Sequence, residues 1–128
     1  MKNALVLVVL VAALFSCGSK NEKLADKSTL SPVEFQDQFK PGVVIIDVRT
    51  PEEFEEGSLP NSLNIDFKNE AFMDNIRLLD KSKTYLVYCA SGVSSGKALE
   101  QMKAEGFQQV YALEGGLNAW KQAGLPMD

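Results

Sequence analysis

The strongest chemical signal in the sequence is one cysteine, Cys89, between an apolar segment and a loop rich in glycine and serine. Residues 88–96 read Tyr-Cys-Ala-Ser-Gly-Val-Ser-Ser-Gly, a pattern typical of a strand end, a tight turn and a helix start. Backbone N–H groups at such a helix start converge on one point and hold an anion without a charged side chain. Because the thiolate is the nucleophilic form of cysteine, this loop predicts a reactive thiol. The alternative is an inert cysteine buried at the end of an apolar strand.

The composition excludes several other kinds of chemistry. The chain has no histidine, which removes Ser-His-Asp and Cys-His catalysis and every histidine-based metal site. We expect neither a metal nor a cofactor. The formal net charge of −4 argues against a nucleic-acid partner, which requires a basic surface. The sequence also lacks a Cys-x-x-Cys pair, so exchange chemistry of the thioredoxin kind is not expected.

The first residues have the pattern of a targeting segment. A short positive start precedes the apolar run Ala4 to Phe15, which is too short for a bilayer span of roughly 20 residues but suits a signal peptide. Leu14 to Cys17 resembles a bacterial lipobox, in which cleavage precedes a cysteine that is then acylated. We therefore predict a signal peptide over residues 1–16 and lipidation of Cys17. The alternative is an ordinary signal peptide with an incidental cysteine.

Lipidation would place the protein in the cell envelope, on the periplasmic or the outer-membrane face. The polar residues 17–29 are expected to form a flexible tether between the membrane and the domain. With Cys17 acylated, Cys89 has no intramolecular disulfide partner. An unpaired thiol in a compartment that favours disulfides is a liability unless it is used.

The remaining residues, 30–128, alternate strand and helix patterns, which is typical of an α/β fold. We predict a three-layer domain with a roughly five-stranded parallel sheet and helices on both faces. Ligands of such sheets bind beyond the carboxyl ends of the strands, where Cys89 is expected. The strand patterns cover 43–48, 62–65, 84–88 and 109–113, and the helix patterns cover 31–39, 51–56, 72–79, 94–105 and 117–123.

Over most of residues 30–125 the chain resembles a rhodanese-like domain, the single-domain sulfurtransferase fold. Three motifs carry the resemblance in the expected order. The first comprises Asp47 to Phe54 followed by Gly57 to Ser62, the second is the loop Cys89 to Ser94, and the third is Glu114 to Trp120. Each motif alone is a weak signal, but their order and separation make the combination specific.

The resemblance implies a covalent, cofactor-free reaction in two steps. Cys89 would take the outer sulfur of a donor such as thiosulfate or a persulfide and pass it to a thiol or cyanide acceptor. Ping-pong kinetics are expected of such a covalent intermediate. The residues whose backbone would hold the anion or the persulfide are Ala90, Ser91, Gly92, Val93, Ser94 and Ser95.

Two positions depart from the pattern of many family members, which carry arginine where this loop has Ala90 and Ser94. The hydroxyl groups of Ser94 and Ser95 are candidates to replace these arginines as donors. Arg49 is expected to pair with Glu53 or another nearby acid, but it is also the nearest candidate for a substrate-binding positive charge.

Two other functions of the loop are alternatives to sulfur transfer. The related phosphatases need an arginine six residues after the cysteine to bind phosphate oxygens, and that position is Ser95 here. Phosphatase activity is therefore not expected. A non-catalytic rhodanese module is the main alternative, with Cys89 acting as a sulfur carrier or redox sensor, or the domain binding a partner.

Overall fold

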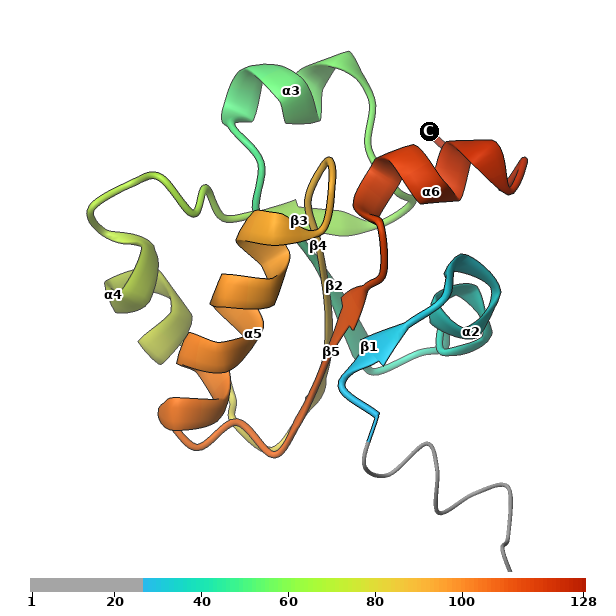
Figure 1. Cartoon of the computed structure of the whole chain (residues 1–128). Helices are drawn as coiled ribbons and strands as arrows, with labels where there is room; N and C mark the ends of the chain where they lie inside the picture. Colours follow the sequence, from blue (N-terminus) through green and yellow to red (C-terminus); the bar gives the residue numbers. More distant parts are fainter. Residues whose placement is uncertain (1–26) are drawn as a thin grey trace, which may run out of the picture.

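The computed structural model describes residues 27–128, which form a parallel sheet covered by helices on both faces (Figure 1). The strand order is β1-β5-β4-β2-β3. This arrangement confirms the predicted fold class. The predicted signal peptide and Cys17 lie outside the described residues. The strands are β1 (Thr29–Leu30), β2 (Val43–Asp47), β3 (Ser62–Asn64), β4 (Thr84–Tyr88) and β5 (Gln109–Leu113), and the helices are α2 (Pro32–Asp37), α3 (Pro51–Glu56), α4 (Phe72–Arg77), α5 (Val93–Ala104) and α6 (Gly116–Gln122).

The central strand β4 contributes side chains to two separate hydrophobic cores. Tyr85 and Val87 pack with α4 and α5 on one face of the sheet, whereas Leu86 and Tyr88 pack with α2 and α6 on the other. Figure 1 shows these two helix layers on opposite sides of the sheet. The alternation follows from the two-residue period of a strand. The same alternation places Cys89 on the face of the sheet that carries Tyr85 and Val87, so Cys89 belongs to the core formed with α4 and α5.

Two helices begin at residues that cap their first turn. Ser31 forms a full capping box at α2, since its hydroxyl oxygen accepts the N–H of Glu34 at 3.3 Å and the Glu34 carboxylate accepts the N–H of Ser31 at 3.0 Å. The hydrogen bond from Lys27, together with those from Ser31, lowers the pKa of Glu34 to about 2. At α3 the Thr50 hydroxyl accepts the N–H of Glu53 at 3.3 Å and donates to its carboxylate at 3.1 Å. Only one of the two hydrogen bonds of a capping box is therefore formed at α3.

The first strand corrects the predicted boundary between tether and domain. Residues 17–29 were expected to form a tether, but Thr29 and Leu30 pair with β5 in parallel. The carbonyl of Ser28 already accepts the N–H of Ala112 at 2.8 Å. The last residues assigned to the tether therefore belong to the sheet, and β1 is the fifth strand that no sequence pattern located.

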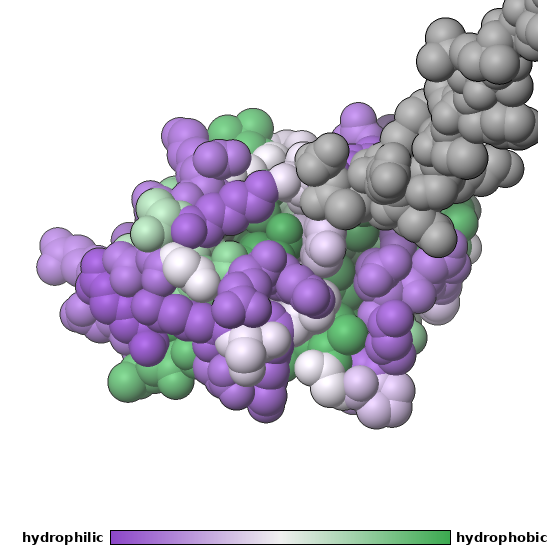
Figure 2. Space-filling model, turned by 90° about the horizontal axis from the view of Figure 1, so that it is seen from below, coloured by the Kyte–Doolittle hydropathy of each residue, from purple (hydrophilic) through white to green (hydrophobic). Residues whose placement is uncertain are grey.

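The surface at the end of the sheet away from Cys89 is largely hydrophilic, with small separate hydrophobic areas (Figure 2). Among residues 27–128 no helix has both the length and the apolar character to cross a membrane. The same residues contain no group of three or more side chains that could hold a metal ion.

Candidate active site

Cys89 follows the carboxyl end of β4 and is nearly buried, with 4% of its surface exposed. Its sulfur is the acceptor for two backbone amides, the N–H of Gly92 at 3.0 Å and the N–H of Ser95 at 3.4 Å. The hydroxyl oxygen of Ser95 lies 3.3 Å from the same sulfur. Three polar groups therefore surround the sulfur, and none of them carries a formal charge. Donors of this kind stabilise negative charge on sulfur.

The loop can fold around the sulfur because Gly92 takes a left-handed conformation, with φ of 97°. This glycine is the N-cap of α5, so the helix begins within the loop and its positive end lies beside the sulfur. Within residues 27–128 the amides of four loop residues donate to no protein acceptor and are free to bind an anion. They belong to Ala90, Ser91, Val93 and Ser94.

The first turn of α6 donates hydrogen bonds to carbonyl groups of the cysteine loop. The N–H of Leu117 donates to the carbonyl of Cys89 at 2.8 Å, and the N–H of Asn118 donates to the carbonyl of Ala90 at 3.0 Å. Gly116 makes this contact sterically feasible, because a Cβ at this position would lie 2.6 Å from both carbonyl oxygens. Two amides of the first turn of α6, which have no partner within the helix, are thus satisfied by carbonyls of the cysteine loop.

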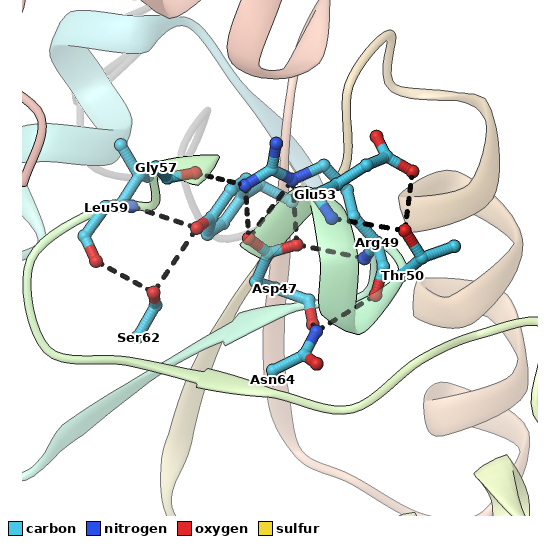
Figure 3. Close-up of polar contacts among 9 residues, drawn as sticks. Asp47, Arg49, Thr50, Glu53, Gly57, Leu59, Ser62 and Asn64 are labelled. Carbon is cyan, nitrogen blue, oxygen red and sulfur yellow. Dashed lines mark hydrogen bonds and ion pairs between the residues drawn. The ribbon is translucent and has the colours of Figure 1, made fainter. Parts of the chain in front are cut away.

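A buried ion pair lies next to the loop, at the end of β2 (Figure 3). Nη2 of Arg49 donates to Asp47, which is completely buried, at 2.8 Å and to the carbonyl of Gly57 at 2.6 Å. Burial lowers the pKa of Arg49, but the hydrogen bonds and charge of Asp47 outweigh burial and raise it overall. Arg49 therefore fixes the segment after α3 to the sheet. Its partner is Asp47 rather than Glu53. The Asp47 carboxylate also accepts the backbone N–H of Arg49 at 2.9 Å.

Tyr88 joins the same segment to β4. Its hydroxyl oxygen accepts the N–H of Leu59 at 3.0 Å and lies 3.3 Å from the hydroxyl of Ser62. Burial raises the pKa of Tyr88 to about 12, so the phenol stays neutral at physiological pH. The residue before Cys89 is therefore held by both its backbone and its side chain.

A cavity of about 140 Å³ opens above Cys89. The predicted loop residues Ala90, Ser91 and Ser94 line it, whereas Ser95 is fully buried beneath the sulfur. Val93 points to solvent, with 63% of its surface exposed. Arg49 also lines the cavity, but its Nε and Nη2 are committed to Asp47 and Gly57.

Three further charged residues line this cavity: Glu53, Asp66 and Lys68. The sequence motifs predict Glu53 only as a partner for Arg49, and they assign no role to Asp66 or Lys68. Asp66 and Lys68 follow the carboxyl end of β3. The rule that ligands bind beyond the carboxyl ends of parallel strands would have drawn attention to them.

Comparisons with known proteins agree with this fold. Residues 31–123 match the family model described as Rhodanese-like domain. The matched region contains strands β2 to β5, the cysteine loop and α6. The chain therefore belongs to the rhodanese family.

The relatives include proteins named as enzymes. The chain is 35% identical to the thiosulfate sulfurtransferase GlpE of Pseudomonas syringae over 72% of its own length and 85% of that protein. A rhodanese-related protein from Thermoplasma volcanium superimposes with a TM-score of 0.71 at 29% identity, covering 78% of this chain and 96% of that one. A rhodanese-like domain protein from Staphylococcus aureus gives a TM-score of 0.63 at 35% identity, covering 73% and 90%.

Gly116→Ala tests the contact between α6 and the loop. The added methyl group would overlap the carbonyls of Cys89 and Ala90, and the positive φ of 60° adds strain, so we expect a loss of about 2–4 kcal/mol in the free energy of unfolding. Gly96→Ala is the matched control, because nothing lies within 4 Å of its added Cβ. A helical glycine of this kind should gain up to about 1 kcal/mol. Urea unfolding measures both values, and equal stability of the two variants would contradict the proposed role of Gly116.

Proposed function

We propose that this protein is a sulfurtransferase that moves sulfane sulfur from a donor such as thiosulfate or a persulfide to a thiophilic acceptor. The observation that carries the proposal is the environment of the Cys89 sulfur, which has two amides and a hydroxyl within hydrogen-bonding distance. The sulfur lies at the base of a small cavity. Membership of the rhodanese family supports the same reaction class.

The reaction would proceed through a persulfide on Cys89. The thiolate attacks the outer sulfur of the donor, and the bond between that sulfur and the rest of the donor breaks. The rest of the donor leaves with the electron pair of that bond. A thiol or cyanide then attacks the outer sulfur of the persulfide, and the Cys89 thiolate is released. Neither step requires an oxidant or a reductant, and the covalent intermediate accounts for the expected ping-pong kinetics.

The two serines would have different tasks in this reaction. Ser95 is fully buried and its hydroxyl lies 3.3 Å from the sulfur, so it would hold the inner sulfur atom. Ser94 lines the cavity and would donate to the outer sulfur or the donor. Neutral donors would thus replace the arginines that many relatives carry in this loop.

We further propose that the reaction takes place in the cell envelope, with the domain attached to the membrane through lipidated Cys17. The support is the apolar run Ala4 to Phe15 followed by the lipobox-like residues Leu14 to Cys17. Several acyl chains on one residue would be required for a stable anchor, because a single chain binds only reversibly.

The central prediction is sulfur loading of the thiol. Purified protein incubated with thiosulfate or a thiol persulfide should gain about 32 Da on Cys89, the mass of one sulfur atom, and lose it on addition of cyanide or a thiol. Intact-protein and peptide mass spectrometry measure both steps, with Cys89→Ser as the control. Gain without release would indicate a carrier, and no gain with any donor would contradict the proposal.

Substituting the serines separately tests their roles. Ser95→Ala leaves the inner sulfur with two amide donors, so we expect the rate of persulfide formation to fall about tenfold, the effect of losing one hydrogen bond to a charged group. Ser94→Ala should slow transfer to a similar or smaller degree without a change in stability. Stopped-flow loading rates and thermal unfolding are the measurements. Undiminished rates in both variants would mean that the hydroxyl groups have no part in the reaction.

The membrane anchor is tested in a bacterial cell that expresses the full chain. Cys17→Ala should move the protein from the membrane fraction to the soluble fraction and abolish incorporation of labelled palmitate. Cys89→Ser is the matched control, because it removes the other cysteine of the chain and should leave both properties unchanged. Membrane association that survives Cys17→Ala would rule out the anchor.

A further inference from the structure

Four ionisable side chains other than the thiol line the cavity above Cys89: Arg49, Glu53, Asp66 and Lys68. The charge of Arg49 is compensated by the buried carboxylate of Asp47. This leaves two carboxylates and one ammonium group facing the space where a donor must bind. The cavity thus has a surplus of negative charge before the thiolate of Cys89 is considered.

Neither carboxylate is neutralised by an ion pair within residues 27–128. Glu53 accepts a hydrogen bond from the Thr50 hydroxyl at 3.1 Å, and Asp66 accepts the backbone N–H of Lys68 at 2.9 Å. Both partners are uncharged groups, so they orient the carboxylates without cancelling their charge. The backbone hydrogen bond also holds Asp66 and Lys68 in one tight turn beside the cavity.

From this arrangement, and on the basis of the sulfurtransferase activity proposed above, we infer that the physiological donor carries an ammonium group. The surplus carboxylate attracts an ammonium group and repels a dianion such as thiosulfate. Lys68 is available for an acidic group on the same donor. A cavity of about 140 Å³ matches the size of a small molecule. The class that fits is a small zwitterionic sulfane donor, such as an amino-acid persulfide.

The transfer step is the same for every donor of this class. The Cys89 thiolate forms a bond to the outer sulfur of R–S–S⁻, the S–S bond of the donor breaks, and R–S⁻ leaves with the electron pair. The products are the Cys89 persulfide anion and a thiolate, so the charge is equal on both sides. The side-chain charges of the cavity therefore act on donor binding and approach rather than on the chemistry.

The inference can be tested with three stable donors that transfer the same kind of sulfur atom but differ in net charge: thiosulfate, methanethiosulfonate and 2-aminoethanethiosulfonate. Each transfers the outer sulfur of an S–SO₂ or S–SO₃ unit, and their net charges are −2, −1 and 0. We expect the second-order rate of persulfide formation on Cys89 to rise in that order. A difference of about tenfold between the extremes at low salt is the scale expected for partly exposed charges, and it should shrink as salt is added.

Variants of the cavity acids test whether these side chains cause the preference. Asp66→Asn and Glu53→Gln keep the hydrogen-bond acceptor and remove the charge, so each should shift the ratio of rates about threefold towards thiosulfate. Lys68→Gln should shift it in the opposite direction. Glu52→Gln is the matched control, because Glu52 is exposed on the same helix as Glu53 but does not line the cavity. A ratio measured within one variant is insensitive to any loss of folded protein.

The outcomes separate this inference from the proposed function. Persulfide formation at equal rates with all three donors, or an unchanged ratio in the Asp66, Glu53 and Lys68 variants, would overturn the inference and leave the sulfurtransferase intact. A faster reaction with thiosulfate than with the amine would also overturn it. No persulfide with any of the three donors would instead contradict the sulfurtransferase itself.

Discussion

The site depends on one contact between backbones, in which the carbonyls of Cys89 and Ala90 accept the first free amides of α6. Because these carbonyls point towards α6, the amides later in the same loop are free to face the sulfur, and those of Gly92 and Ser95 do so. The contact requires an approach that only glycine permits at position 116. The third sequence motif and the cysteine loop are therefore one structural unit, although nineteen residues separate them in the sequence.

Much of the fold could be predicted because its signals are local. The β-branched run beginning at Val43 becomes β2, the capping residue Ser31 starts α2, and Cys89 lies at the end of β4 as expected. The first strand could not be predicted in this way. Thr29–Leu30 is two residues long, too short for any periodicity, and its hydrogen bonds come from β5, about eighty residues away in the sequence.

The residues of the site could be predicted from the sequence only where they belong to one of the three motifs. The loop was placed correctly, and Arg49 was expected to pair with a nearby acid, but the choice of Asp47 over Glu53 depends on burial. Asp47 is fully buried and needs a compensating charge, whereas Glu53 is partly exposed. Asp66 and Lys68 line the cavity because β3, which precedes them, is the edge strand beside β2. The order of the strands along the chain does not by itself show which strands are neighbours in the sheet.

In the proposed reaction, different parts of the molecule hold the sulfur and select the donor. The groups on the sulfur are two backbone amides, whose positions the loop conformation fixes, and the buried hydroxyl of Ser95. The charged groups of the cavity come from α3 and from the turn after β3, where Asp66 and Lys68 are at least partly exposed. Surface positions of this kind tolerate substitution at a cost of about 0.5 kcal/mol or less. Donor preference can therefore change in this fold without loss of stability, and the absence of arginine from the loop need not abolish sulfur transfer.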